Sequence, residues 1–155
     1  MTTLTAQSGV DSLVLTKEQN DRWILKLEKE IKRDQLDLIK KRILLDTNIY
    51  ISKYYADRIK FDNEKAKKNR TEGYERPLLI FNGQYAAYID NGTKSKSVIK
   101  LTELLTDNRI KNISIMKPPQ STVLYGSRAS CGVILLTTKD KKTLKQIKEI
   151  DLSVD

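Results

Sequence analysis

The stretch from residue 113 to residue 139 holds the side chains whose types and spacing come nearest to chemistry. Ser127 stands in Tyr-Gly-Ser-Arg, not in the Gly-x-Ser-x-Gly of a hydrolase nucleophile, and the 155-residue chain has no histidine to activate it. Cys131 has no candidate base nearby, and its small apolar neighbours predict a buried thiol. The glycines at 126 and 132 are not followed by the Gly-Lys-Ser/Thr of a phosphate-binding loop. Neither nucleophilic catalysis nor phosphate binding is predicted for this stretch.

Acid–base and metal chemistry have no better candidates. Asp107, Asp140 and Glu149 are isolated, so no carboxylate pair for general acid–base catalysis is evident. One cysteine and no histidine exclude an internal disulfide, a cysteine-rich zinc site and a histidine-ligated metal. We therefore expect a non-enzymatic protein with no cofactor and no metal.

The same stretch has a consistent structural interpretation. A helix that ends at Tyr125 needs a tight reversal, which Gly126 supplies. Arg128 is placed to bind loop carbonyls or a carboxylate. Gly132 lets the chain enter the next strand without steric cost, and that strand, residues 133–138, is apolar enough to be central in a sheet.

The elements that must position this stretch are short and separated by turns from Pro77 onward. We predict strands over residues 78–81 and 85–89, a helix over 98–105 with Ser97 as its N-cap, a strand over 110–116, a short helix over 121–128, a strand over 133–138 and a helix over 143–150. Asn82-Gly83, between the first two strands, is the strongest short hairpin signal because both residues tolerate positive φ. The order β-β-α-β-α-β predicts an α+β fold, a small mixed sheet with helices.

A long helix is predicted before this region, over residues 17–46. Thr16 can cap it, and Gln19 completes a capping box. Its apolar stripe consists of Trp23, Ile24, Leu27, Ile31 and Leu38, widened by Leu36, Ile39 and Ile43. Such a helix needs a cover for its apolar face. The cover is either the protein's own domain or, through Trp23, Ile24, Leu27, Ile31 and Leu38, a partner or a second copy.

Three parts follow from these patterns. Residues 1–16 are a disordered N-terminus or the remnant of a signal peptide, 17–76 a helical region with a linker, and 77–155 the α/β domain. Within the second part we expect helix to about residue 66 and a solvated linker over residues 69–76.

The chain carries 29 basic and 20 acidic side chains, a formal net charge of +9. This charge allows an acidic partner, but the excess is divided between residues 17–76 and 77–155 and predicts no concentrated patch. Basic residues beside tyrosines in residues 47–76 suit nucleic-acid stacking, yet such patterns more often form an amphipathic surface and no binding motif accompanies them. No run of 18 apolar residues occurs, so no transmembrane helix is predicted.

Residues 77–139 resemble a known family, the plug domain of TonB-dependent outer-membrane receptors, and in particular the starch-utilisation type of the Bacteroidetes. The similar blocks are the opening strand and turn at 77–83, the strand and lysine at 113–117, the helix and turn at 121–128 and the last strand at 132–139. The most specific are Tyr125-Gly126-Ser127-Arg128 and the block that begins at Gly132, and all four blocks occur in the family's order.

The chain also departs from the family's pattern. Pro118-Pro119 replaces an acidic-small pair, and Ala129-Ser130-Cys131 replaces Gly-Ala-Asn. No segment like a TonB box is evident in residues 1–16, and the family's plug has no counterpart of residues 17–76. No β-barrel follows Lys139, so we do not expect a transporter.

The resemblance implies a detached plug fold that serves as a recognition or regulatory module at the bacterial envelope. The expected partner is a protein, such as a component of an outer-membrane receptor. A periplasmic or outer-membrane location requires that Leu4 to Gln7 be the remnant of a signal peptide, whereas the N-terminus as written predicts the cytoplasm. Two alternatives are a basic cytoplasmic module that binds nucleic acid and a structural protein that self-associates through its long helix.

Overall fold

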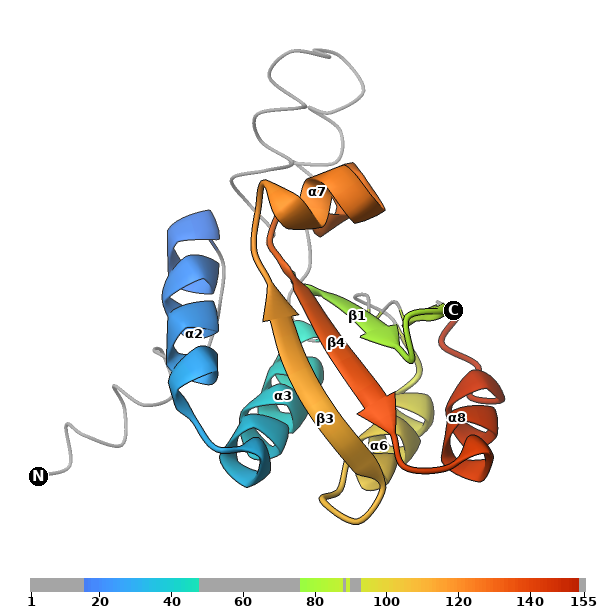
Figure 1. Cartoon of the computed structure of the whole chain (residues 1–155). Coiled ribbons are helices and arrows are strands. Elements are labelled where there is room, and N and C mark those ends of the chain that lie inside the picture. Colours follow the sequence, from blue (N-terminus) through green and yellow to red (C-terminus); the bar gives the residue numbers. More distant parts are fainter. Residues whose placement is uncertain (1–15, 48–75, 88, 90–92, 154–155) are drawn as a thin grey trace, which may run out of the picture.

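A computed structural model describes residues 16–47, 76–87, 89 and 93–153 of the chain (Figure 1). The predicted N-terminal remnant, the predicted helix beyond residue 47, nearly all of the predicted linker and the end of the predicted strand at residue 88 lie outside these ranges. The described part is an α+β fold, in which helices pack on a four-stranded mixed sheet. This confirms the predicted fold class.

The four strands form one sheet in the order β2-β1-β4-β3. Their bounds are Leu78–Phe81 for β1, Tyr85–Ala87 for β2, Ile110–Met116 for β3 and Val133–Thr138 for β4. β1 pairs antiparallel with β2 and parallel with β4, and β3 pairs antiparallel with β4. β4 therefore has a neighbour on each side, which confirms the prediction from its apolar sequence.

The helices lie at the start of the chain and between the strands. Their bounds are Lys17–Lys29 for α2, Lys32–Asp46 for α3, Ser95–Leu104 for α6, Gln120–Tyr125 for α7 and Lys141–Lys148 for α8, with a 3-10 turn, η1, at Ser127–Ala129. The prediction that Ser97 caps its helix is wrong. α6 starts earlier because the Lys94 carbonyl accepts from both Ser97 N–H and Val98 N–H, which places Ser97 in the first turn, where it is buried.

The predicted single helix over residues 17–46 is also wrong, because the chain breaks it into α2 and α3. Glu30 and Ile31 adopt extended backbone angles there, with ψ of 155° and 159°. The Gln35 side chain stabilises the end of α2, since its Nε2 donates to the Leu27 carbonyl at 3.0 Å. The predicted capping box of Thr16 and Gln19 at the start of α2 is confirmed.

The break has a packing reason. A continuous helix would carry Ile31 on the same face as Leu27. The two helices instead turn separate apolar stripes inward, so Leu27 is fully buried while Ile31 is 68% exposed. The buried members of both stripes are Ile24 and Leu27 from α2 and Leu36, Ile39 and Ile43 from α3. The described helices thus cover their apolar faces with the protein's own sheet, the first of the two alternatives raised by the sequence.

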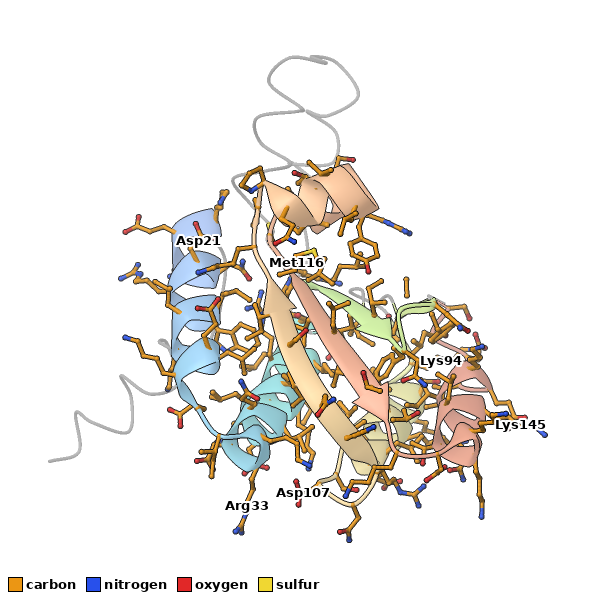
Figure 2. The ribbon with its side chains drawn as sticks, in the orientation of Figure 1. Asp21, Arg33, Lys94, Asp107, Met116 and Lys145 are labelled. Atoms are coloured by element: carbon orange, nitrogen blue, oxygen red, sulfur yellow. The ribbon has the colours of Figure 1, made fainter. Side chains whose placement is uncertain are left out.

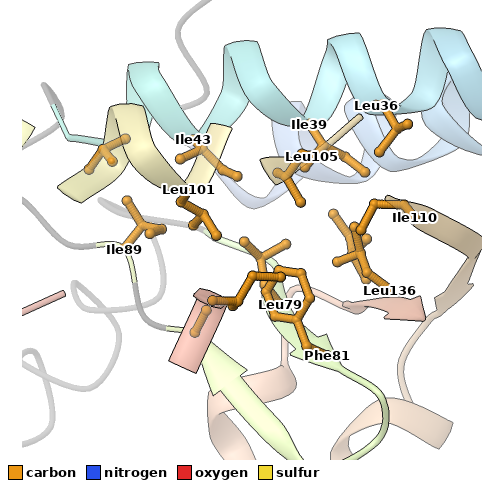
Figure 3. Close-up of a cluster of buried hydrophobic side chains, with 14 of the residues drawn as sticks. Leu36, Ile39, Ile43, Leu79, Phe81, Ile89, Leu101, Leu105, Ile110 and Leu136 are labelled. Carbon is orange, nitrogen blue, oxygen red and sulfur yellow. The ribbon is translucent and has the colours of Figure 1, made fainter. Parts of the chain in front are cut away.

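The main hydrophobic core lies on one face of the sheet, the face covered by α3, α6 and α8 (Figure 1). Figure 3 shows Ile39 and Ile43 of α3 and Leu101 of α6 beside Leu79 and Phe81 of β1. Because successive strand side chains alternate between faces, Leu78 and Ile80 of β1 point to the other side. There they join Ala129 and Val133 in a second, smaller cluster.

Candidate protein-binding site

The connection between β3 and β4, residues 117–132, is the part of the fold that holds the most specific sequence blocks. We call it the α7 turn. It leaves β3 at Lys117, passes a cis peptide bond between Pro118 and Pro119, forms α7 and η1, and re-enters the sheet after Gly132. Figure 1 shows it at one end of the sheet, above the ends of β3 and β4. The sheet therefore presents this turn at an end of the molecule.

Gly126 makes the reversal that the sequence predicted. Its φ of 79° and ψ of −166° lie in a region that essentially only glycine adopts. Its N–H donates to the Thr122 carbonyl at 2.9 Å, and Arg128 Nε donates to the Tyr125 carbonyl at 3.2 Å. The predicted contact of Arg128 with a loop carbonyl is thus confirmed, and Tyr125 itself packs partly buried against the second cluster.

A buried hydroxyl joins the two halves of the α7 turn. Ser121 Oγ donates to the Ala129 carbonyl at 2.8 Å, and both residues are fully buried. Ser121 is the only buried residue of α7, so this bond and the apolar contacts of Ala129 hold the six-residue helix against η1. Sequence reasoning placed Ser121 in the helix but gave it no role. A small hydroxyl residue before a glycine reversal was the available signal.

Gly132 has a steric reason to be glycine. Its φ is 95°, and a Cβ at this position would lie 3.3 Å from the Met116 carbonyl oxygen. The two strands that carry the α7 turn therefore approach each other closely at its base. Cys131, next to it, is 5% exposed, which confirms the predicted buried thiol.

The predicted hairpin turn lies at the other end of the sheet. Asn82 and Gly83 have φ of 52° and 68°, as a tight turn between β1 and β2 requires. The Asn82 side chain also holds the end of β4, donating to Thr138 Oγ1 at 3.0 Å and accepting from Thr138 N–H at 2.8 Å. Because Gly132 directly precedes β4 and Thr138 ends it, the structure does not bring Asn82 and Gly83 together with the α7 turn.

The α7 turn displays two neighbouring apolar side chains to solvent. Val123 is 79% exposed and Leu124 is 60% exposed, and both belong to α7. They are the two most exposed of the large hydrophobic residues on the described surface apart from Ile31. The helical pattern could not identify them, because α7 is too short to show a periodic stripe.

A groove runs beside this turn, between α2 and the end of β3. Its volume is about 250 Å³, and it is lined by apolar side chains and the charged groups around them: Ile24, Leu25, Pro118, Cys131 and Gly132, with Lys17, Asp21 and Lys117. Leu25 is 47% exposed at its rim. The α7 turn and α2 therefore share an apolar depression at the surface.

A buried polar network ties α2 and α3 to the base of the turn. Asn20 Nδ2 donates to the Cys131 carbonyl at 2.8 Å, and Arg42 Nη2 donates to Asn20 Oδ1 at 3.1 Å. Arg42 also forms a buried ion pair with Asp46, with Nε and Oδ1 3.0 Å apart, and lies 4.8 Å from the ring centre of Trp23. Burial raises the pKa of the Asp46 carboxyl, and the Arg42 guanidinium opposes that shift. The i, i+4 spacing of Arg42 and Asp46 was a sequence signal for the pair.

The predicted partner-binding stripe on the first helix is divided in the structure. Ile24 and Leu27 are buried, Trp23 and Leu38 pack partly buried against the main core, and Ile31 alone is mostly exposed. These side chains do not meet in one exposed surface. The exposed apolar pair of the α7 turn and the groove beside that turn are the other apolar features of the described surface.

Three further features of the described residues concern a metal site, a membrane-spanning helix and an accessible nucleophile. Within the described ranges, no three His, Cys, Asp or Glu side chains gather as a metal site would require. None of the described helices combines the length and the apolar character needed to cross a bilayer. Ser127, the other nucleophile considered from the sequence, lies exposed in η1.

Comparison with known proteins gave no relative. No family model, no curated protein and no solved structure matches the chain. The resemblance to plug domains therefore depends on the sequence blocks alone.

Proposed function

We propose that the chain is a plug-like, non-enzymatic module that binds a protein at the bacterial envelope through the α7 turn. The observation that carries the proposal is the exposure of Val123 and Leu124 on a turn that is otherwise held in place. The partner is a protein with an apolar contact surface, such as a component of an outer-membrane receptor.

The energetics favour a recognition role for this pair. Exposed side chains of this size gain about 1.5–3 kcal/mol each when they are fully buried, so two neighbours supply a small binding centre. Affinity also improves when the binding residues are already ordered before the partner arrives. The Ser121–Ala129 hydrogen bond and the reversal at Gly126 provide that order.

The location follows from the resemblance and not from the fold. Plug domains face the periplasm, so the proposed site of action is the periplasmic side of the outer membrane. The proposal requires export of the chain.

A matched pair of variants tests the proposal. Val123→Ser with Leu124→Ser removes the exposed pair, and Ile99→Ser removes an apolar side chain on α6 that is 49% exposed. The purified proteins are compared as baits against envelope extracts from the source bacterium. We expect the parent and Ile99→Ser to recover one and the same envelope protein and the double variant to lose it. Recovery by all three baits, or by none, would contradict the proposal.

A further inference from the structure

The outer edge of β3 offers a second contact, one formed by the main chain. β3 is an edge strand, because the strand order places β4 on one of its sides only. Figure 1 shows no described strand on its outer side, where α2 lies. An edge strand presents unpaired N–H and C=O groups, which can pair with another extended chain.

The hydrogen bonds of β4 identify which groups of β3 point outward. The carbonyls of Gly132 and Leu136 accept from the amides of Leu78 and Asn82, so the main-chain groups at 132 and 136 point toward β1. The main-chain groups of successive residues point to opposite sides of a strand. Those of the intervening positions 133, 135 and 137 therefore point toward β3. Their partners in register are Met116, Ser114 and Asn112.

The main-chain N–H and C=O groups of the positions between these partners must therefore point away from the sheet. These positions are Ile113 and Ile115, each with one N–H and one C=O. Among the described residues, neither has a strand on that side to bind. Their side chains pack partly buried against the main core, which holds the strand in place.

Polar contacts from α2 and α3 fix both ends of this edge. At the end near Asp107, Lys32 Nζ donates to the Ile110 carbonyl at 3.1 Å and lies 2.8 Å from Asp107 Oδ1. At the other end, beyond Met116, Lys117 Nζ lies 3.2 Å from Glu28 Oε1 of α2. Figure 2 shows Asp107 and Met116 at these opposite ends.

The groove described above continues the same edge. Lys117 and Pro118, which follow β3 directly, line it together with Leu25 of α2. A strand added along β3 would reach the groove past Met116 and could place an apolar side chain there. The edge and the groove together fit an extended chain that has alternating side chains.

Charge selects between a foreign strand and a second copy. Antiparallel pairing of two β3 strands through Ile113 and Ile115 would centre on Ser114 and bring Lys111 of one copy to Lys117 of the other. Like charges opposite each other in a sheet are destabilising, and each copy carries +9. An acidic segment would instead be attracted by the exposed Lys111 side chain and by the net positive charge of the chain.

We propose that the outer edge of β3 binds an extended acidic segment of a partner protein by strand addition, with main-chain bonds to Ile113 and Ile115. The inference rests on the proposed protein-binding function and adds the form in which the partner binds. It does not depend on Val123 or Leu124, so the two proposals can fail separately.

Amide hydrogen exchange tests the proposal at single residues. The probe is a synthetic peptide, acetyl-Glu-Val-Asp-Val-Glu-Val-amide, added to the full chain at millimolar concentration, with a version that has lysine at the acidic positions as its control. We expect the amides of Ile113 and Ile115 to exchange fast in the free protein and those of Ser114 and Met116 slowly. The acidic peptide should slow exchange at Ile113 and Ile115, and the basic one should not.

A variant pair separates the main-chain donor from the side chain. Proline is tolerated at an edge position whose N–H faces outward, so Ile113→Pro removes the outward donor and leaves the bonds to β4. Ile113→Ala loses the side chain and keeps the donor. We expect Ile113→Pro to weaken peptide binding roughly tenfold relative to Ile113→Ala, the effect of about one hydrogen bond. The exchange experiment on the parent chain decides the matter if Ile113→Pro does not fold.

Three results would overturn the inference. Slow exchange at Ile113 and Ile115 in the free protein would show that the edge is already paired. Exchange that slows with protein concentration alone would assign the edge to a second copy. Unchanged exchange in the presence of the acidic peptide would exclude strand addition, while the recovery of an envelope protein through Val123 and Leu124 would remain as an independent result.

Discussion

The Ser121 hydroxyl donates to the Ala129 carbonyl at 2.8 Å, across a glycine reversal and with both residues fully buried. This bond fixes a six-residue helix that is too short to be stable alone. The α7 turn is therefore an ordered part of the fold.

Loss of this bond should destabilise the protein measurably. In Ser121→Ala the Ala129 carbonyl stays buried without its donor, which costs about 1–3 kcal/mol. Thr122→Ala is the control, because the Thr122 hydroxyl bonds the Pro119 carbonyl at an exposed position. Urea unfolding of both variants measures the difference. Equal stability of the two would show that the Ser121 bond does not hold the turn.

The break between α2 and α3 predicts opposite outcomes for two residues that a single helix would place on one face. Leu27→Ala should lower the free energy of unfolding by about 2–5 kcal/mol, since Leu27 is fully buried. Ile31→Asp should leave it unchanged or raise it by up to about 2 kcal/mol, since Ile31 is 68% exposed and is the N-cap of α3, where an aspartate can accept from a free N–H of the first turn. Thermal unfolding of the two variants provides the comparison. A strongly destabilised Ile31→Asp would indicate that Ile31 is covered in solution.

Gly132 should be far less replaceable than a glycine in open space. Gly132→Ala combines a positive φ with a Cβ 3.3 Å from the Met116 carbonyl oxygen, so we expect a loss of about 1–3 kcal/mol or more. Gly83→Ala has the positive φ alone, because nothing lies within 4 Å of its Cβ. Its loss should be smaller. The prediction fails if chemical denaturation ranks the two variants in the reverse order.

The Arg42–Asp46 ion pair should behave as a unit. Arg42→Met removes the guanidinium that is bonded to the buried Asp46 carboxylate and leaves Arg76 as a weaker cationic neighbour, so we expect a loss of about 3–5 kcal/mol. Adding Asp46→Leu should restore much of that loss, because the double variant no longer buries either charge of the pair. Stability measurements on the two single variants and the double variant complete the cycle. Strictly additive losses would contradict the coupling.

The pKa shifts of exposed carboxyls predict part of the stability at acid pH. The main-chain and hydroxyl groups of Ser153, and then Lys94, lower the pKa of Asp151 to about 2 from its ordinary 3.8. A lowered folded-state pKa means that this stabilisation is full above pH 3.8 and is lost as the pH falls toward 2. Asp107 and Asp140 have lowered pKa values as well and add to the same trend.

Asp151→Asn checks this assignment. The variant should show a shallower fall of the melting temperature below pH 3.8 than the parent, because it has no carboxylate to protonate. Asn112→Thr, an exchange at an exposed position of β3 that involves no carboxyl, is the control and should follow the parent curve. An unchanged acid slope in Asp151→Asn would assign the acid sensitivity to other groups.

Much of the fold could be predicted because local signals and tertiary structure agree. Asn82-Gly83 indicated its hairpin, the apolar run from Val133 indicated an inner strand, and Thr16 with Gln19 indicated the start of α2. The break at Ile31 was missed because it contains neither glycine nor proline. It depends on the direction in which each helix meets the sheet, which no local pattern records.

The candidate site could be predicted only in part. The glycines at 126 and 132 and Arg128 were assigned correct local roles from their types. The exposure of Val123 and Leu124 follows from the way α7 packs on η1, and the outward direction of the main-chain groups of Ile113 and Ile115 follows from strand order and register. Those are long-range properties, and apolar residues in a short element read as core from sequence alone.

The central claim is that the α7 turn contacts a partner protein through its exposed apolar pair, and site-specific photo-crosslinking in the cells that naturally produce the protein tests it most directly. A photoreactive amino acid is placed at position 123 or 124 and, as the control, at position 99 of α6. The account predicts a crosslink to one envelope protein from 123 and 124 and none from 99. No crosslink from 123 or 124, or the same products from all three positions, would contradict it.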